Sequence, residues 1–286
     1  MRNTFLFCLV GIFWGASFIA IKYVIAAVPP VTGAAARVGV ALLTLYIIFL
    51  TTGKKLTVPA KDRRALWLTG FFGLALPFSL VFWGEQWISA GVTGMLNGTV
   101  PIWTFGLGLV FLREYEKFSL RKLAGIVMGL AGLLFIFAPS LGGFELWGSL
   151  AVTGMALSYA ISTLMAKRLL SGKSKVSVPA SVFHQHTGAF VCMIVMTLAV
   201  DGFTLPRFTG AAVAGTIYLG VFSTALGFIV FNFLIREWGA TRAAAITYIV
   251  PLAAVCFDWL FFGNLPTPTA LFGALLVLSG VFLIRR

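Results

Sequence analysis

The chain is a succession of long apolar runs separated by short polar breaks. A helix of about 20 apolar residues crosses the hydrocarbon core of a bilayer, and the runs have about this length. Breaker residues such as Pro59, Gly172 and Pro206 fall between them. The pattern therefore predicts ten membrane-spanning helices, over residues 4–25, 32–52, 65–83, 88–111, 120–138, 145–166, 179–200, 211–234, 240–262 and 268–284.

The runs form two similar halves. When Pro101 is placed over Pro251, other positions coincide without a gap: Gly70 with Gly220, Ala75 with Ala225, Phe78 with Phe228, Ala90 with Ala240 and Phe111 with Phe261. Because each half has an odd number of spans, the second half enters the membrane from the opposite side. The predicted fold class is an all-α membrane protein with ten transmembrane helices as two inverted five-helix repeats, residues 1–140 and 144–286.

Composition supports a membrane protein and argues against a soluble enzyme. Of 286 residues, 60% are hydrophobic and 10% charged, and the mean hydropathy is +1.02. A soluble domain cannot hide that much apolar surface. Ten spans leave only short connections, with no room for a soluble catalytic domain. The cysteines Cys8, Cys192 and Cys256 lie in apolar runs without paired spacing, so we expect no disulfide, metal site or cofactor.

The net charge of +13 could indicate a nucleic-acid partner, but the placement of the charges argues against one. In the ten-helix model, 18 of the 21 Lys and Arg residues fall on one side of the membrane, and the other side receives Lys22, Arg37 and Arg207. Positive residues mark the cytoplasmic side. We therefore expect both termini in the cytoplasm. The first run contains Trp14 and Lys22 and is followed by further spans, so it is interpreted as an uncleaved helix.

Several motifs carry a family resemblance. They are WGASFIAIKY at residues 14–23, Pro101, Glu114 in the loop that follows, and the glycines Gly125, Gly129 and Gly132. With these the chain resembles the EamA-type transporters of the drug/metabolite transporter (DMT) superfamily, and within it the YddG-like amino-acid exporters. The second half departs from the pattern at Asn264, where a glutamate is usual. The resemblance implies a multi-pass transporter of a bacterial inner (plasma) membrane.

Two mid-span prolines and a few polar residues are candidates for a substrate site. A proline inside a helix frees backbone carbonyls, so Pro101 and Pro251 indicate either a hinge beside a cavity or only a kink. Asn97 and Thr247 each lie one turn before these prolines. The further polar candidates are Ser17, Ser162 and Asn232. The alternative is that these side chains only form hydrogen bonds between helices.

Aromatic residues share helix faces with these polar positions. The candidates for a pocket wall are Trp14, Phe18, Phe78, Phe82, Tyr159, Phe228 and Tyr248. A pocket walled by rings with few polar groups suits an amphipathic organic solute. The alternative is that the rings face lipid or the membrane interface.

Four charged residues fall towards the predicted non-cytoplasmic side: Lys22, Arg37, Glu85 and Asp258. Charges at membrane depth are costly and are usually paired or functional. They indicate either structural pairing, such as Asp258 with Lys22 or Arg37, or an outer gate or protonatable coupling site.

The predicted function is a secondary transporter that exports amino acids, aromatic or other neutral, or related small metabolites by alternating access. Its partners are a small-molecule substrate and the lipid bilayer, and we expect it to work as a monomer. A multidrug or nucleotide-sugar carrier is the alternative within the class. An intramembrane enzyme lacks convergent catalytic groups, a channel would more naturally use a ring of subunits, and no P-loop pattern supports ATP-driven transport.

Overall fold

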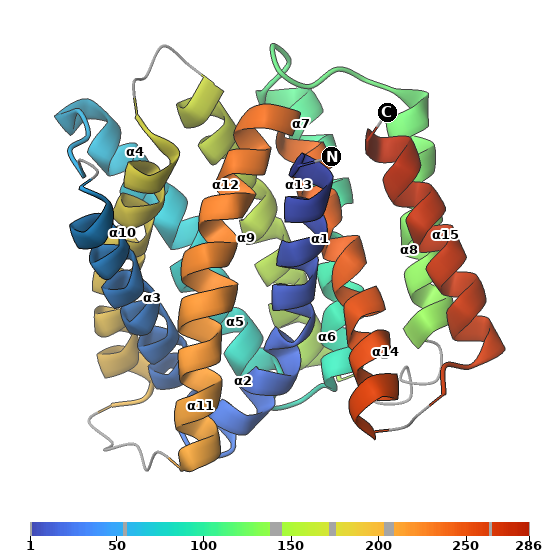
Figure 1. The fold of residues 1–286 in the computed structure, drawn as a ribbon, viewed down its shortest axis with the longest axis horizontal. Helices are drawn as coiled ribbons and strands as arrows, with labels where there is room; N and C mark the ends of the chain where they lie inside the picture. The colour runs from blue at the N-terminus through green and yellow to red at the C-terminus, as the bar shows by residue number, and fades with distance from the viewer. Residues whose placement is uncertain are drawn as a thin grey trace.

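The computed structural model describes residues 2–53, 56–137, 145–171, 176–202, 209–262 and 265–285. In these ranges the chain forms helices joined by turns, without a strand, so the prediction of an all-α membrane fold is confirmed. Figure 1 shows a bundle with both chain ends at its upper end. The predicted boundary between the halves, at residues 141–143, lies outside the described ranges.

The described residues of the first half form eight α-helices. They are α1 (Arg2–Gly15), α2 (Ser17–Ile25), α3 (Pro30–Thr52), α4 (Ala60–Gly70), α5 (Leu76–Gly84), α6 (Ala90–Asn97), α7 (Val100–Phe111) and α8 (Leu120–Phe137). A π-helical segment, Phe71–Ala75, joins α4 to α5. Start signals fit the sequence: Pro30 opens α3, and the Ser89 hydroxyl accepts a hydrogen bond from Val92 N at the start of α6.

In the described ranges of the second half, the chain forms seven α-helices. They are α9 (Leu146–Ser171), α10 (Val178–Val200), α11 (Gly210–Tyr218), α12 (Gly227–Trp238), α13 (Ala240–Ala244), α14 (Ile249–Phe262) and α15 (Pro268–Arg285). A π-helical segment, Leu219–Leu226, joins α11 to α12, and a 3₁₀ turn, Ala245–Tyr248, joins α13 to α14.

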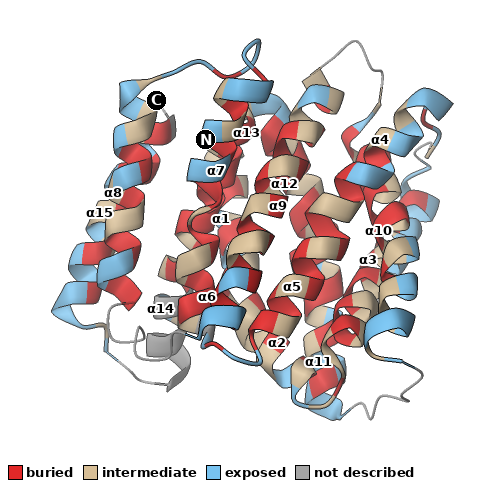
Figure 2. Ribbon diagram, turned by 180° about the vertical axis from the view of Figure 1, so that it is seen from behind, coloured by how far each residue is buried: buried red, intermediate tan, exposed pale blue. Residues whose placement is uncertain are grey.

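Eight helical stretches in the described part of the chain are long and apolar enough to cross a membrane. They are Arg2–Ile25, Pro30–Thr52, Ala60–Gly84, Gly91–Phe111, Leu120–Phe137, Leu146–Ser171, Val178–Val200 and Gly210–Trp238. Two shorter apolar stretches, Ala240–Ala253 and Pro268–Ile284, accompany them. Large apolar side chains such as Leu50 on α3 and Leu275 on α15 are exposed on the outside of the bundle, as expected of a surface solvated by lipid (Figure 2).

Several spans that the sequence predicted as continuous helices are interrupted. The first span breaks at Ala16 and the fourth at Gly98 and Thr99, and the ninth contains the 3₁₀ turn. Proline explains the fourth: Pro101 cannot donate a backbone hydrogen bond and its ring would clash with the carbonyl of Asn97. Pro251 follows the 3₁₀ turn in the same way. The two prolines therefore begin new helical segments instead of kinking continuous ones.

The π-helical segments release carbonyl groups that side chains from neighbouring helices satisfy. Ser158 of α9 donates to Phe72 O (2.7 Å) in the first π-helical segment, and Ser162 donates to Thr69 O (2.9 Å), two residues before that segment. Trp14 of α1 donates through Nε1 to Ser223 O (2.8 Å) in the second. Irregular backbone is tolerated in a membrane where such partners exist. Each π-helical segment is thereby tied to a helix of the opposite half of the sequence.

Helices α8 and α15 pack side by side at one edge of the bundle (Figures 1 and 2). Their backbones touch through glycines, because a Cβ atom at Gly132 would lie 2.5 Å from Gly273 O, and one at Gly125 would lie 2.7 Å from Gly280 O. The reverse approaches, from Gly273 and Gly280, are equally close at 2.5 Å. Small residues that allow such contact are typical of membrane helix interfaces.

A buried acidic residue joins the end of α7 to α13. Glu116 accepts a hydrogen bond from Thr241 Oγ1 (2.8 Å) and forms an ion pair with Lys122. Glu114, the loop residue that carried the family resemblance, is exposed instead. The buried carboxylate therefore links the two halves of the chain at the end of the bundle where the termini lie.

We expect Gly132→Val to destabilise the protein, because the new side chain would strike the α15 backbone. Overpacking of this kind costs about 1–3 kcal/mol. Thermal unfolding in detergent measures the effect. Gly106→Val is the matched control, because a Cβ atom at Gly106 meets nothing within 4 Å. Equal melting temperatures for the two variants would contradict the proposed backbone contact.

Candidate functional site

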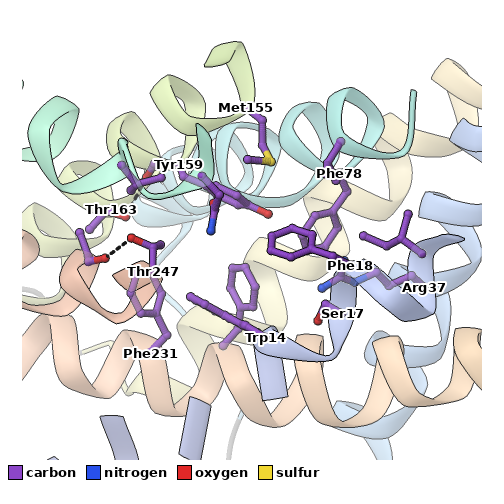
Figure 3. A pocket seen from close by; sticks show the side chains of 16 residues that line it. Trp14, Ser17, Phe18, Arg37, Phe78, Met155, Tyr159, Thr163, Phe231 and Thr247 are labelled. Atoms are coloured by element: carbon purple, nitrogen blue, oxygen red, sulfur yellow. Dashed lines mark hydrogen bonds between the residues drawn. The ribbon is translucent and has the colours of Figure 1, made fainter. Parts of the chain in front are cut away.

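A narrow cavity of about 50 Å³ lies among helices from both halves of the chain. Its walls come from α1, α2, α3, α5, α6, α7, α9, α12, α13 and the 3₁₀ turn that follows α13. Figure 3 shows the lining side chains directed towards one another. The lining residues are Trp14, Ser17, Phe18, Ile21, Arg37, Phe78, Val81, Asn97, Val100, Met155, Tyr159, Thr163, Phe228, Phe231, Ala244 and Thr247.

The structure brings many of the predicted site residues together in this cavity. From the predicted substrate site these are Trp14, Ser17, Phe18, Phe78, Asn97, Tyr159, Phe228 and Thr247. Arg37, which the sequence analysis placed in the gate group, also lines the cavity.

Other predicted site residues lie away from the cavity. Phe82 and Tyr248 are buried among other side chains, and the Tyr248 hydroxyl donates to Ile126 O (3.0 Å). Pro101 is buried in the first turn of α7. Pro251 lines a small separate cavity beside Gly15.

Ser162 and Asn232 line a second small cavity next to the first, together with Gln185. Both polar atoms of the Asn232 amide are engaged: Nδ2 donates to Phe228 O (3.0 Å), and Oδ1 accepts from Gln185 Nε2 (3.1 Å). The Ser162 hydroxyl donates to Thr69 O. Both side chains therefore form hydrogen bonds between or within helices, the alternative that the sequence had left open.

Aromatic rings form a continuous wall along the cavity. The Trp14 ring centroid lies 5.1 Å from that of Phe231 and 5.8 Å from that of Phe228. Phe78 contacts Phe228 and Tyr159 edge to face, with centroids 6.1 and 6.4 Å apart. Edge-to-face pairs of this geometry hold one another in place. The wall can therefore present apolar faces to a solute without collapsing.

The break in the first span is fixed by hydrogen bonds to α11 and the π-helical segment that follows it. Phe13 O accepts from Tyr218 Oη and from Ser223 Oγ, both at 2.9 Å. Ser17 Oγ lies 2.9 Å from Ser223 Oγ and 3.1 Å from Phe13 O. Much of the hydrogen-bonding capacity of Ser17 is therefore used within the protein, although its side chain borders the cavity.

Polar groups stand at the two ends of the cavity. Figure 3 shows Arg37 and Ser17 at one end and Thr163 and Thr247 at the other, with aromatic rings between them. The two threonines donate to Tyr159 O (2.7 Å) and Ala244 O (3.0 Å), which leaves their oxygens able to accept. The site thus has an aromatic middle and polar ends.

Seven lining residues are not among those predicted from the sequence: Ile21, Val81, Val100, Met155, Thr163, Phe231 and Ala244. Helical spacing held a usable signal for some of them, because Val81 and Phe231 each follow a predicted ring by three residues and Thr163 follows Tyr159 by four. Met155, four residues before Tyr159, has the same relation.

Of the remaining gate candidates, Lys22 and Glu85 lie outside the cavity lining. Lys22 of α2 donates through Nζ to Ile88 O (2.8 Å) and to the carbonyl oxygen of Glu85, which lie in the turn between α5 and α6. The Glu85 side chain is fully buried. Asp258 belongs to α14, but its side chain is outside the described part of the structure, as is its predicted pairing. No group of three metal-ligating side chains occurs among the described residues.

An all-helical membrane chain with an aromatic-walled cavity between its helices has the architecture of a transporter. The model of the EamA-like transporter family matches residues 1–138 and 146–286, and the chain belongs to this family. The family is part of the DMT superfamily, as the sequence resemblance implied. The protein is therefore a multi-pass membrane transporter and not an enzyme.

Individual relatives share only low sequence identity with this chain. The chain is 28% identical over 278 residues to the uncharacterized transporter YoaV of Bacillus subtilis, covering 96% of this chain and 93% of the relative. It is 28% identical over 230 residues to a probable terminal-alkyne amino-acid exporter of Streptantibioticus cattleyicolor, covering 79% and 74%. It is 23% identical over 290 residues to a probable amino-acid metabolite efflux pump of Salmonella typhimurium, covering 99% and 94%.

One solved crystal structure superposes on this chain with a TM-score of 0.81 at 17% identity, covering 99% of this chain and 96% of the other. At this identity the likeness concerns the fold alone.

We expect Trp14→Phe to lower the thermal stability of the protein, because Ser223 O would lose its hydrogen-bond donor inside the bundle. Interhelical hydrogen bonds in membranes contribute about 0.6 kcal/mol on average and up to about 1.7 kcal/mol. The melting temperature in detergent measures the loss. Trp147→Phe is the control, because Trp147 is 67% exposed. An unchanged melting temperature for Trp14→Phe would contradict a structural role of the indole N–H.

Proposed function

We propose that the protein is a secondary transporter that exports amino acids, aromatic or other neutral ones, or related small metabolites by alternating access. The observation that carries the proposal is the cavity itself, which has an aromatic wall and polar ends and lies between helices of both halves. Such a site suits an amphipathic solute. The names of two relatives, an amino-acid exporter and an amino-acid metabolite efflux pump, support the substrate class.

We propose further that ten transmembrane helices form two inverted five-helix repeats, residues 1–140 and 144–286. Three observations support this frame. The family model matches twice, once in each half. Helix breaks occur just before both Pro101 and Pro251, and a π-helical segment occurs at matching positions in each half. The last helix of each half, α8 and α15, contacts the other reciprocally through glycines, Gly125 with Gly280 and Gly132 with Gly273.

The proposed location is a bacterial inner membrane, with both termini in the cytoplasm and a monomer as the working unit. The positive residues concentrate on the side that the ten-helix arrangement assigns to the termini. The shared position of the two chain ends in Figure 1 is consistent with this orientation. Several of the relatives are bacterial.

A nucleotide-sugar carrier is the alternative within the transporter class. Its substrates carry phosphates, which attract several cations. Arg37 is the one cationic residue among the described residues that line the cavity. This favours a solute with no more than one anionic group at that end. A multidrug carrier would share the aromatic wall and differs by its tolerance of unrelated solutes.

Alternating access requires that the bundle open at the end of the cavity where Lys22 lies. The hydrogen bonds from Lys22 to the turn between α5 and α6 close the bundle at the end away from the termini. We propose that Lys22, Glu85 and Asp258 form the outer gate or coupling group. A buried carboxylate is costly in its charged form, which makes the fully buried Glu85 a candidate to carry a proton.

Counterflow in proteoliposomes tests the function. Liposomes preloaded with one unlabelled amino acid are expected to accumulate the same labelled amino acid transiently and with saturation, for at least one aromatic or other neutral member of a panel. Asn97→Leu is expected to reduce this counterflow about tenfold, because a buried cavity amide is lost. Gln86→Leu, at an exposed amide, is the control. Absence of counterflow for the whole panel would overturn the amino-acid proposal, and unsaturable conductance would favour a channel.

Glu85→Gln tests whether Glu85 couples transport to a proton gradient. If Glu85 carries the coupled proton, its amide variant is expected to transport at the same rate with and without a pH gradient, whereas the wild type is accelerated by the gradient. Asp258→Asn is measured in parallel as the second coupling candidate. Glu114→Gln, at an exposed carboxylate, is the control. Wild-type acceleration that survives both substitutions would assign these acids to structure and not to coupling.

A further inference from the structure

Arg37 is a buried cation that borders the cavity. Arg37 lies seven residues after Pro30, the first residue of α3, which is about 10 Å along the helix axis at 1.5 Å per residue. Its residue surface is only 4% exposed, and yet its side chain is part of the cavity lining. Figure 3 shows it at one end of the cavity, close to Ser17, Phe18 and Phe78. A charge in such a position is costly unless it has a partner or a function.

Two contacts fix the orientation of the guanidinium group without neutralising it. Its Nε donates to Thr224 Oγ1 at 2.6 Å, and its central carbon lies 3.8 Å from the centroid of the Phe78 ring. A guanidinium has five N–H donors, of which Nε supplies one. The Thr224 hydroxyl therefore fixes the Nε side of the guanidinium group, and the Phe78 ring covers one of its faces.

The terminal nitrogens of Arg37 have no acceptor among the described residues. Arg37 takes no part in the ion pairs of Lys122 with Glu116 and of Arg236 with Glu237. No ion pair between Arg37 and Glu85 is present among the described residues. The two terminal nitrogens form a fork whose geometry matches a carboxylate bidentately.

The second half of the chain has no cation at the position that corresponds to Arg37. Gly220 packs against the backbone carbonyl of Arg37, and its repeat counterpart Gly70 packs in the same way against the carbonyl of Gln185. The position that corresponds to Arg37 in the second half is therefore an uncharged amide. Gln185 Nε2 donates to Ser181 Oγ and Asn232 Oδ1, so this amide is engaged within the protein. The architecture thus does not itself require a cation at this place.

We propose that Arg37 is the anchor for the carboxylate of the transported solute. This inference rests on the proposed function and narrows its substrate class to amphipathic monocarboxylates, amino acids included. The carboxylate pairs with the terminal nitrogens of Arg37, and the apolar part of the solute lies along Trp14, Phe18 and Phe78. A single fork suits one carboxylate better than a phosphate chain, which draws several cations.

Ligand-induced thermal stabilisation of the purified protein in detergent tests the anchor independently of transport. The probes are two matched pairs: phenylalanine with phenylalaninamide, and leucine with leucinamide. Each pair differs in the carboxylate alone. 3-Phenylpropionate, which keeps the carboxylate and lacks the amine, is the fifth probe. The apparent affinity follows from the dependence of the melting temperature on probe concentration.

In the wild type we expect a carboxylate probe to bind about 10- to 100-fold more tightly than its amide, the range of a charge-assisted hydrogen-bonded pair. Arg37→Gln, which introduces the residue of the other half, is expected to remove this preference. Arg37→Lys keeps the charge and loses the fork, so an intermediate preference is expected. Thr224→Val removes the hydroxyl that accepts from Arg37 Nε, so we expect this variant also to weaken the preference for the carboxylate probe. Arg113→Gln, at an exposed arginine, is the control.

An acid preference that persists in Arg37→Gln would overturn the anchor, as would equal wild-type binding of acids and amides or stabilisation by none of the probes. If Arg37→Gln does not fold, Arg37→Lys and Thr224→Val decide in the same way. Counterflow separates the two proposals. Binding of carboxylates through Arg37 without counterflow would overturn the transport function and support the anchor, whereas counterflow without dependence on Arg37 would do the opposite.

Discussion

Inside a bilayer, each backbone carbonyl that an irregular helix releases needs a donor from the protein, and the rest of this structure depends on that constraint. The described residues include π-helical segments at Phe71–Ala75 and Leu219–Leu226. Ser158 donates to a carbonyl of the first and Trp14 to a carbonyl of the second, and each donor comes from the opposite half of the sequence. Irregular backbone is therefore what joins the halves around the cavity.

The same constraint limits how many polar groups remain for a solute. Ser17 lies at the cavity, but its hydroxyl belongs to the network around Phe13 O and Ser223. Asn232 is likewise committed to Phe228 O and Gln185. Once these groups are engaged, the described cavity side chains whose donors are not all used within the protein include Arg37, Asn97 and Tyr159. Selectivity then depends on a few positions set in an aromatic wall.

The sequence alone could predict the apolar spans and the helix faces that carry many of the cavity residues, because both follow from the spacing of residues along a helix. It could not choose between adjacent positions such as Ser162 and Thr163. One residue turns a helix by about 100°. Ser162 therefore reaches Thr69 O while Thr163 borders the cavity. The break at Ala16 was equally hidden, because the groups that stabilise it, Tyr218 and Ser223, lie far away in the chain. Arg37 was recognised as unusual, but its exposure to the cavity depends on how α3 packs on Thr224.

The glycine contacts between α8 and α15 carry a mechanical consequence. With backbone touching backbone at two levels, no flexible side chain lies at these points to absorb a sliding motion. Neither helix contributes a described residue to the cavity. We therefore expect the pair to move as one rigid unit, if it moves at all. Any change in access to the cavity would then have to come from rearrangement of the helices that line it and not from sliding between α8 and α15.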